Sequence, residues 1–172
     1  MFMNEHERFK TNRKLHESVR EIRGRILNSV AVIDVKISEI LTTYFCNDNK
    51  KKGLLMSEVF SNQAYGLRTK IKLLETIVKR DFAFYIKDKD NASLFKDLDS
   101  LREFRNDVAH ATIDVSEKAH KNADKEVGFV FYKNGERKTK IVSFKKAEDY
   151  RVKANMVSGR LTEIGRLLGI NI

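Results

Sequence analysis

The chain has 172 residues, which suits one hydrophobic core better than two, so we expect a single domain over residues 1–172. Hydrophobic residues make up 41% and charged residues 34%, a balance typical of a globular protein and not of a disordered or fibrous one. Subtracting 24 acidic from 34 basic side chains leaves a net charge of +10, which makes nucleic acid the leading partner class, although a Lys-rich surface also serves solubility alone.

Cysteine usage and the first residues indicate a cytoplasmic protein. Cys46 is the only cysteine, which rules out an intramolecular disulfide or a Cys-rich zinc site and fits a reducing compartment. The opening segment, residues 1–8, is polar where a signal peptide needs an apolar stretch. Because no later apolar run approaches the ~20 residues of a membrane span, we expect no membrane association.

The first third of the chain predicts a long amphipathic helix. Its apolar residues recur at steps of three and four: Ile22, Ile26, Val30, Ile33, Ile37, Ile40, Leu41 and Tyr44. Residues 1–21 are highly charged and are expected to form a loosely packed helical extension, with Gly24 as a candidate bend. The turn-forming, charged segment Asn47–Gly53 then predicts a break.

Three further helices are expected in the middle of the chain and one at its end. Leu54–Phe60 suggests a short helix, followed by a break at Tyr65–Gly66. Helical spacing then covers 67–78, and again 94–108 with a cap near Asn91 or Ser93. The last helix begins between 143 and 146 and stops at Gly169.

One β-hairpin is expected between these helices. β-Branched and aromatic runs at 127–132 and 139–144 flank an Asn134-Gly135 turn, which is typical of a two-stranded hairpin. No other β element is expected. The predicted fold class is therefore all-α, a helical bundle with one inserted hairpin at about residues 127–144 before the last helix.

Two charged residues fall on apolar helical faces. Arg105 lies four positions after Leu101 and three before Val108, and Asp34 lies on the stripe that includes Val30. A charged side chain on a buried face needs a partner. Two interpretations stay open: a paired, partly buried polar site, or an ordinary interhelical ion pair.

Asn106 and His110 are four positions apart, so they share one helical face. Arg105 and His110 are less well aligned, because on an ideal helix they point about 140° apart. Their convergence requires the long reach of arginine or a distorted helix end, unless a second subunit supplies the missing half of the site.

The segment Arg105-Asn106-Asp107-Val108-Ala109-His110 resembles the HEPN superfamily, whose signature is an arginine, usually followed by a polar residue, four to six positions before a histidine. The flanking string 101–110 and the long preceding helix with Asp34 look like the mannitol operon repressor branch. The resemblance covers residues 25–112 loosely and 101–110 closely, and it implies a HEPN-like helical bundle. The hairpin matches no part of the pattern.

Active members of that superfamily are metal-independent ribonucleases, so the resemblance implies RNA as the substrate and no cofactor. His110 would exchange protons near neutral pH, and Arg105 would hold and neutralise the phosphate. Asn106 would bind phosphate or orient the imidazole, and Asp34 would fix the guanidinium. Because one histidine supplies only an acid or a base, we expect a homodimer, as is typical of the family.

The basic residues across the hairpin have two possible roles. They either grip phosphates or form a solubilising edge that deters strand pairing. The residues expected to contact nucleic acid are Lys138, Lys140, Lys145 and Lys146. The other histidines, His6, His16 and His120, are expected at the solvated surface, and no spacing typical of a metal site is present.

Three functions remain in competition. The intact arginine, asparagine and histidine favour an endoribonuclease, such as a toxin or antiphage effector with an antitoxin or regulatory protein as a further partner. The branch resemblance favours a non-catalytic regulator or a module that binds protein or nucleic acid. A plain DNA-binding regulator ranks last, because the sequence contains no helix-turn-helix with its glycine-containing turn.

Overall fold

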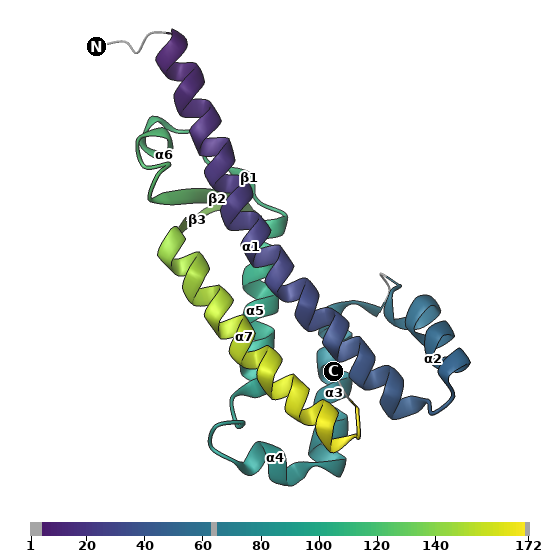
Figure 1. Cartoon of the computed structure of the whole chain (residues 1–172). Coiled ribbons are helices and arrows are strands. Elements are labelled where there is room, and N and C mark those ends of the chain that lie inside the picture. Colours follow the sequence, from purple (N-terminus) through teal and green to yellow (C-terminus); the bar gives the residue numbers. More distant parts are fainter. Residues whose placement is uncertain (1–4, 63–64, 171–172) are drawn as a thin grey trace. The chain divides into compact units, whose positions relative to one another are not determined.

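The computed structural model describes residues 5–62 and 65–170, with side chains from Lys10 onward (Figure 1). The chain is 72% helical and carries a small antiparallel sheet of three strands, which confirms the mostly helical class. The elements in chain order are α1 (Glu5–Phe45), α2 (Asn49–Leu55), the π-helical turn η1 (Met56–Phe60), α3 (Leu67–Asp81), α4 (Ala83–Lys87), α5 (Leu94–Ala109), β1 (Thr112–Ile113), α6 (Glu117–Lys121), β2 (Glu126–Lys133), β3 (Glu136–Ser143) and α7 (Phe144–Leu167).

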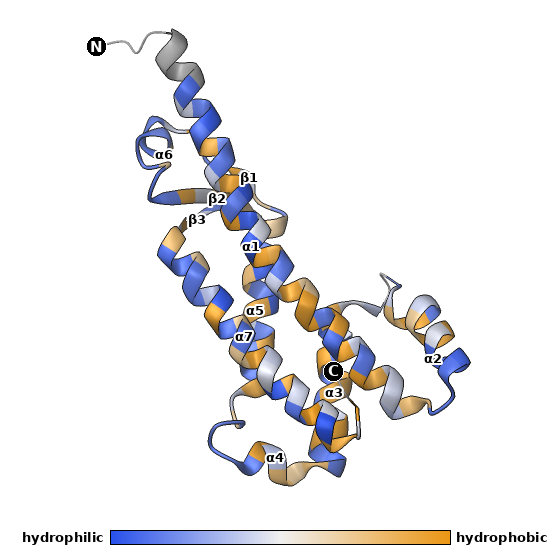
Figure 2. Cartoon of the chain, viewed as in Figure 1, coloured by the Kyte–Doolittle hydropathy of each residue, from blue (hydrophilic) through white to orange (hydrophobic). Residues whose placement is uncertain are grey.

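Helix α1 is longer and better packed than its charged beginning suggests. It continues through Gly24 without a break, and apolar residues recur along its length (Figure 2). Leu15 and Val19 are both buried, so the expectation of a loose extension over residues 1–21 is wrong from Leu15 onward. The reason is that two apolar residues four positions apart are enough to anchor one helical face.

The charged segment after α1 is also more helical than predicted. Asp48 accepts a hydrogen bond from the Lys51 backbone N–H at 2.9 Å and so caps α2, which contains the lysine run. The predicted break over 47–53 shrinks to residues 46–48. The short helices α4 and α6 were not expected either, because each has only five residues and shows no apolar periodicity.

The predicted hairpin is present, and its turn has the backbone that Asn-Gly favours. β2 and β3 pair in antiparallel register, with Lys133 opposite Glu136. Asn134 (φ 55°) and Gly135 (φ 80°) both adopt the left-handed region that a tight hairpin turn requires. The expectation that this hairpin is the only β structure is wrong, because the two-residue strand β1 pairs with β2. So short a strand has no alternating pattern to reveal it.

The start and end of α7 follow local capping rules. Ser143 Oγ accepts a hydrogen bond from the Lys146 backbone N–H at 3.1 Å, which satisfies one free donor of the first turn. At the other end, Gly169 has φ 71°, and the Ile170 N–H donates to the Gly165 carbonyl at 2.9 Å. This is the glycine-terminated arrangement that commonly ends helices, and it confirms the predicted stop.

The chain divides into two compact units. The hairpin unit comprises residues 1–28 and 104–152, and the helical unit comprises 29–103 and 153–172. Buried residues of the hairpin unit include Leu15, Val19, Ile22, Ile26, Val108, Val127, Phe129 and Val142. Buried residues of the helical unit include Ile33, Ile37, Leu41, Ile71, Leu74, Leu98, Leu161 and Ile164. The expectation of one domain stays a prediction.

Candidate functional site

The end of α5 places the predicted motif in the hairpin unit. Leu101 and Val108 are buried, as the apolar spacing requires, and the helix ends at Ala109. His110 lies just beyond this end, exposed to solvent, and its backbone N–H donates to the Asn106 carbonyl at 3.2 Å. This is the i→i−4 hydrogen bond of a helix, so His110 occupies the position at the C-terminal boundary of α5.

Arg105 has a partner within the motif itself. It is half-buried, and its Nη1 donates to Asn106 Oδ1 at 3.0 Å. Burial raises the pKa of the neighbouring Tyr150 phenol, and the positive charge of Arg105 opposes that rise. The ring of Tyr150 lies 4.9 Å from that of Phe104 between centroids. The guanidinium thus lies beside an aromatic pair and is oriented by an amide oxygen.

Asp34 pairs with a residue that we did not predict. Its carboxylate accepts a hydrogen bond from Lys70 Nζ at 2.6 Å, within the helical unit, whereas Arg105 belongs to the hairpin unit. Asp34 thus forms an ion pair with a buried lysine, and its expected role in fixing Arg105 stays a prediction. The sequence does contain a signal for this pair: Lys70 lies three after Leu67 and four before Leu74, on the buried face of α3.

Arg23 is a residue of this region that sequence reasoning missed. Its Nη2 donates to the backbone carbonyl of Ala111 at 2.8 Å, and its guanidinium lies 5.4 Å from the centre of the Phe129 ring. Among the described residues, its Nε is buried without a hydrogen-bond partner. Nothing in the local pattern of α1 distinguishes Arg23 from the exposed arginines around it. Arg23 differs from them because the chain after His110 lies against it and supplies the Ala111 carbonyl.

Two of the predicted nucleic-acid contacts gather around Phe104. Lys140 forms an ion pair with Asp107, and its ammonium lies 5.0 Å from the centre of the Phe104 ring. The ammonium of Lys146 lies 5.7 Å from the same ring. The structure therefore gives Lys140 a carboxylate partner inside the chain, where we expected a phosphate. Both lysines nevertheless lie next to the residue that precedes Arg105.

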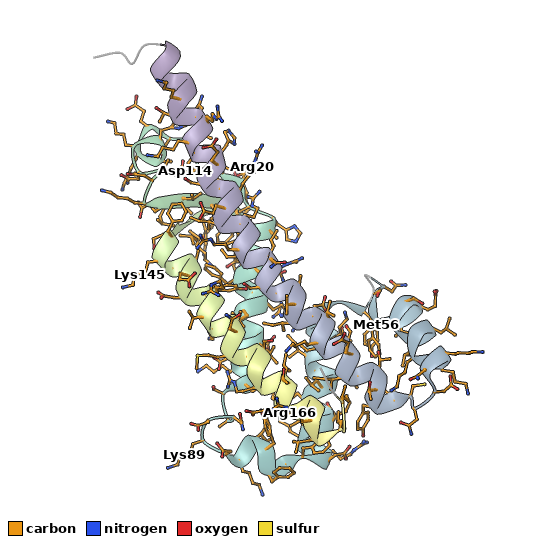
Figure 3. All side chains as sticks on the ribbon, viewed as in Figure 1. Arg20, Met56, Lys89, Asp114, Lys145 and Arg166 are labelled. Atoms are coloured by element: carbon orange, nitrogen blue, oxygen red, sulfur yellow. The ribbon has the colours of Figure 1, made fainter. Side chains whose placement is uncertain are left out.

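The other two predicted contacts are more exposed. Lys138 pairs with Glu136 on the hairpin at 3.4 Å, and both side chains are open to solvent. Lys145 is exposed at the start of α7, where Figure 3 shows it projecting away from the ribbon. Over residues 10–62 and 65–170, no ion pair involves Lys145 or Lys146. Of the four predicted contacts, Lys145 and Lys146 are therefore the two without a carboxylate partner among the described residues.

The remaining histidines differ from one another. His16 is exposed, as expected, whereas the side chain of His6 lies outside the described residues. His120 is half-buried and its Nδ1 is enclosed without a partner among the described residues, so the expectation of a solvated surface residue is wrong. In the described part of the chain, no three His, Cys, Asp or Glu side chains cluster as metal ligands would. No described helix is long and apolar enough to cross a membrane.

Comparison with known proteins identifies no relative. No family model, curated protein or solved structure matches the chain.

Proposed function

We propose that this protein is a metal-independent endoribonuclease that cleaves RNA through Arg105, Asn106 and His110. The observation that carries the proposal is the exposed imidazole of His110, which follows the hydrogen-bonded Arg105–Asn106 pair at the end of α5. The resemblance of this segment to the HEPN superfamily supports the same reaction. A toxin or antiphage effector is the biological role that fits such an activity.

The imidazole of His110 and the guanidinium of Arg105 perform different parts of the reaction. The 2′-hydroxyl of a ribose loses its proton to the imidazole of His110, and the resulting oxygen attacks the adjacent phosphorus. The guanidinium of Arg105 offers a fork of donors to the phosphate oxygens as negative charge accumulates on them. The bond from phosphorus to the 5′-oxygen breaks, and that oxygen takes up a proton. The products are a 2′,3′-cyclic phosphate and a 5′-hydroxyl end.

The proton for the leaving oxygen needs a second donor, which is the reason for proposing a homodimer. In each chain, His110 is the only histidine of the motif. Two copies that bring their α5 ends into one cleft would supply a base and an acid together. Lys146, beside Phe104, and the exposed Lys145 at the start of α7 add positive charge and would attract the RNA backbone.

The test incubates purified protein with structured RNA and a chelator. We expect wild type to cleave, and Arg105→Ala and His110→Ala to lose at least about 100-fold in rate. His16→Ala is the matched control, because it removes another exposed histidine and should cleave like wild type. Equal cleavage by all four proteins indicates a contaminating nuclease. Cleavage of an all-deoxy substrate would contradict the mechanism, which requires the 2′-hydroxyl.

A second candidate function, a non-catalytic regulator, is favoured by one observation. The hydrogen bond from Arg105 to Asn106 is also what a purely structural arginine would make. Under this alternative, neither wild type nor Arg105→Ala cleaves RNA, and Arg105→Ala has a lower free energy of unfolding than wild type. Urea denaturation of wild type and Arg105→Ala, run beside the cleavage assay, separates the two functions.

A further inference from the structure

The hairpin has one face that is open to solvent near its turn. Side chains alternate between the two faces of a strand, so Val127 and Phe129, with Val142 opposite, lie on one face and are buried. The other face carries Tyr132 opposite Arg137. We use the name Tyr132 face for the four exposed residues Tyr132, Arg137, Thr139 and Ile141.

The Tyr132 face combines a large exposed ring with apolar area. The side chain of Tyr132 is 74% exposed and that of Ile141 46% exposed. The register places Thr139 and Ile141 opposite Val130 and Gly128, which are buried, so the open part of this face consists of Tyr132 and the three residues of β3. A tyrosine ring this open presents a flat surface on which another aromatic group can stack. No described residue forms a ring contact with it.

The cations of the hairpin differ in their ion-pair partners and in the face that they occupy. Lys138 and Lys140 have carboxylate partners in the chain, Glu136 and Asp107. Lys133 and Arg137 form no ion pair with any described residue, but only Arg137 lies on the Tyr132 face, because Lys133 alternates to the face of Phe129. An open ring opposite one unpaired guanidinium matches a ligand that is both aromatic and anionic.

We propose that the Tyr132 face binds single-stranded RNA, with an unpaired base stacked on Tyr132 and the adjacent phosphate held by Arg137. This rests on the proposed function in taking RNA as the ligand, and it names the substrate as RNA with unpaired bases. Stacking requires a base whose face is open, so a continuous duplex does not fit. The Arg137 fork matches a phosphate oxygen pair.

The binding experiment is separated from cleavage by the choice of probe. A fluorescein-labelled single-stranded oligonucleotide with 2′-O-methyl riboses lacks the attacking hydroxyl, so fluorescence anisotropy reports binding alone. Stacking of a base on an aromatic residue contributes about 5- to 150-fold in affinity, and we expect Tyr132→Ala to weaken binding within that range. Tyr132→Phe keeps the ring and should bind like wild type.

Three further measurements distinguish stacking from simple charge attraction. Phe84→Ala removes a ring that is 63% exposed in the helical unit, and it should leave binding unchanged. Arg137→Ala should weaken binding and reduce its salt dependence. An oligonucleotide with abasic sites should bind to wild type as weakly as the intact one binds to Tyr132→Ala. Circular dichroism of each variant checks that the fold is retained.

Several outcomes overturn this proposal. Equal binding by Tyr132→Ala and wild type, or equal binding of abasic and intact oligonucleotides, shows that phosphate attraction alone is responsible. If wild type does not bind RNA, RNA is not the ligand of the Tyr132 face. If binding follows the expected pattern while natural RNA stays uncut, the proposed ribonuclease activity fails and the Tyr132 face stands. If wild type cleaves RNA but Tyr132→Ala binds RNA like wild type, the ribonuclease activity stands and the proposed role of the Tyr132 face fails.

Discussion

Arg23 of α1 donates a hydrogen bond of 2.8 Å to the backbone carbonyl of Ala111, the residue directly after His110. On the other side, the His110 backbone N–H donates to the carbonyl of Asn106. The main chain of His110 is thus held on both sides while its imidazole stays in solvent. An exposed histidine on an anchored backbone suits a group that must meet a substrate in a defined place.

Removal of the Arg23 anchor should lower both stability and cleavage. Arg23→Met deletes a charge-assisted hydrogen bond to the carbonyl of Ala111, a buried residue, and should cost about 1.5–3 kcal/mol in urea denaturation. Cleavage of RNA should also slow under conditions where the variant is folded. Arg20→Met, at an exposed position of the same helix, is the control and should change neither. Equal denaturation midpoints for the two variants would contradict the anchoring role.

The Asp34–Lys70 pair should respond very differently to loss of each partner. The Lys70 side chain is only 6% exposed, whereas that of Asp34 is 38% exposed. Asp34→Asn leaves a buried ammonium without its counterion and should cost about 3–5 kcal/mol. Lys70→Met removes the buried charge and leaves a carboxylate that reaches water, so it should cost less than about 1 kcal/mol. Thermal and urea unfolding measure both.

A matched comparison for that pair is available on α3. Glu75→Gln breaks a pair with Lys79, whose side chain is 59% exposed where that of Lys70 is buried, and should cost only about 0.3–0.5 kcal/mol. If Asp34→Asn costs no more than Glu75→Gln, then water reaches the Lys70 ammonium and the assignment of a buried pair is wrong.

The Lys140–Asp107 pair should show measurable coupling in a double-mutant cycle. Both side chains are about one-third exposed or less, at 27% and 32%. Replacement of each by alanine, singly and together, should give a coupling of about 0.5–1 kcal/mol in urea denaturation. The more exposed Lys138–Glu136 pair is the control and should couple by less than about 0.5 kcal/mol. Additive effects at Lys140 and Asp107 would show that the ion pair contributes nothing.

Asp97 should make the chain less stable in acid. Burial raises the pKa of this carboxyl, but hydrogen bonds from Lys153, Arg160 and Ser93 outweigh that effect and hold its pKa well below the usual range. The lowered folded-state pKa means that the stabilisation is complete above the ordinary aspartate pKa near 4, and is lost as the pH falls below it.

The measurement for Asp97 is urea denaturation between pH 2 and pH 7. Asp97→Asn should remove much of the difference in unfolding free energy across this range, because an amide cannot take up the proton. Asp149→Asn alters an exposed residue that forms no ion pair with any described residue, and it should retain the wild-type slope. An unchanged slope in Asp97→Asn would contradict the prediction.

Two glycines should respond to alanine in opposite directions. A Cβ at Gly128 would lie 2.7 Å from the Cβ of Asp114, so Gly128→Ala forces the backbone apart and should cost about 1–3 kcal/mol. Gly24 lies inside α1 with nothing within 4 Å of its position, so Gly24→Ala should stabilise by up to about 1 kcal/mol. Thermal denaturation of the two variants compares them directly. A stabilised Gly128→Ala would show that Asp114 moves freely.

Local sequence rules were enough to predict the longer regular elements. The buried residues Leu94, Leu98, Leu101 and Val108 define the packed face of α5, and their spacing alone indicated that helix. The Asn134-Gly135 turn and Gly169 were recognised for the same reason, because their backbone angles depend on neighbours only a few residues away. Short elements such as β1 and α6 were not predicted, since they form only when a longer strand or loop supports them.

The sequence by itself therefore determined the longer helices, the hairpin and the motif at the end of α5. Only the tertiary structure decided which charged groups meet. The carboxylate of Asp34 binds Lys70, Lys140 binds Asp107, and Arg23 reaches the chain beyond His110. Helical and strand periodicity specifies the face on which a charge lies, but the partner of that charge depends on which distant segment packs against it.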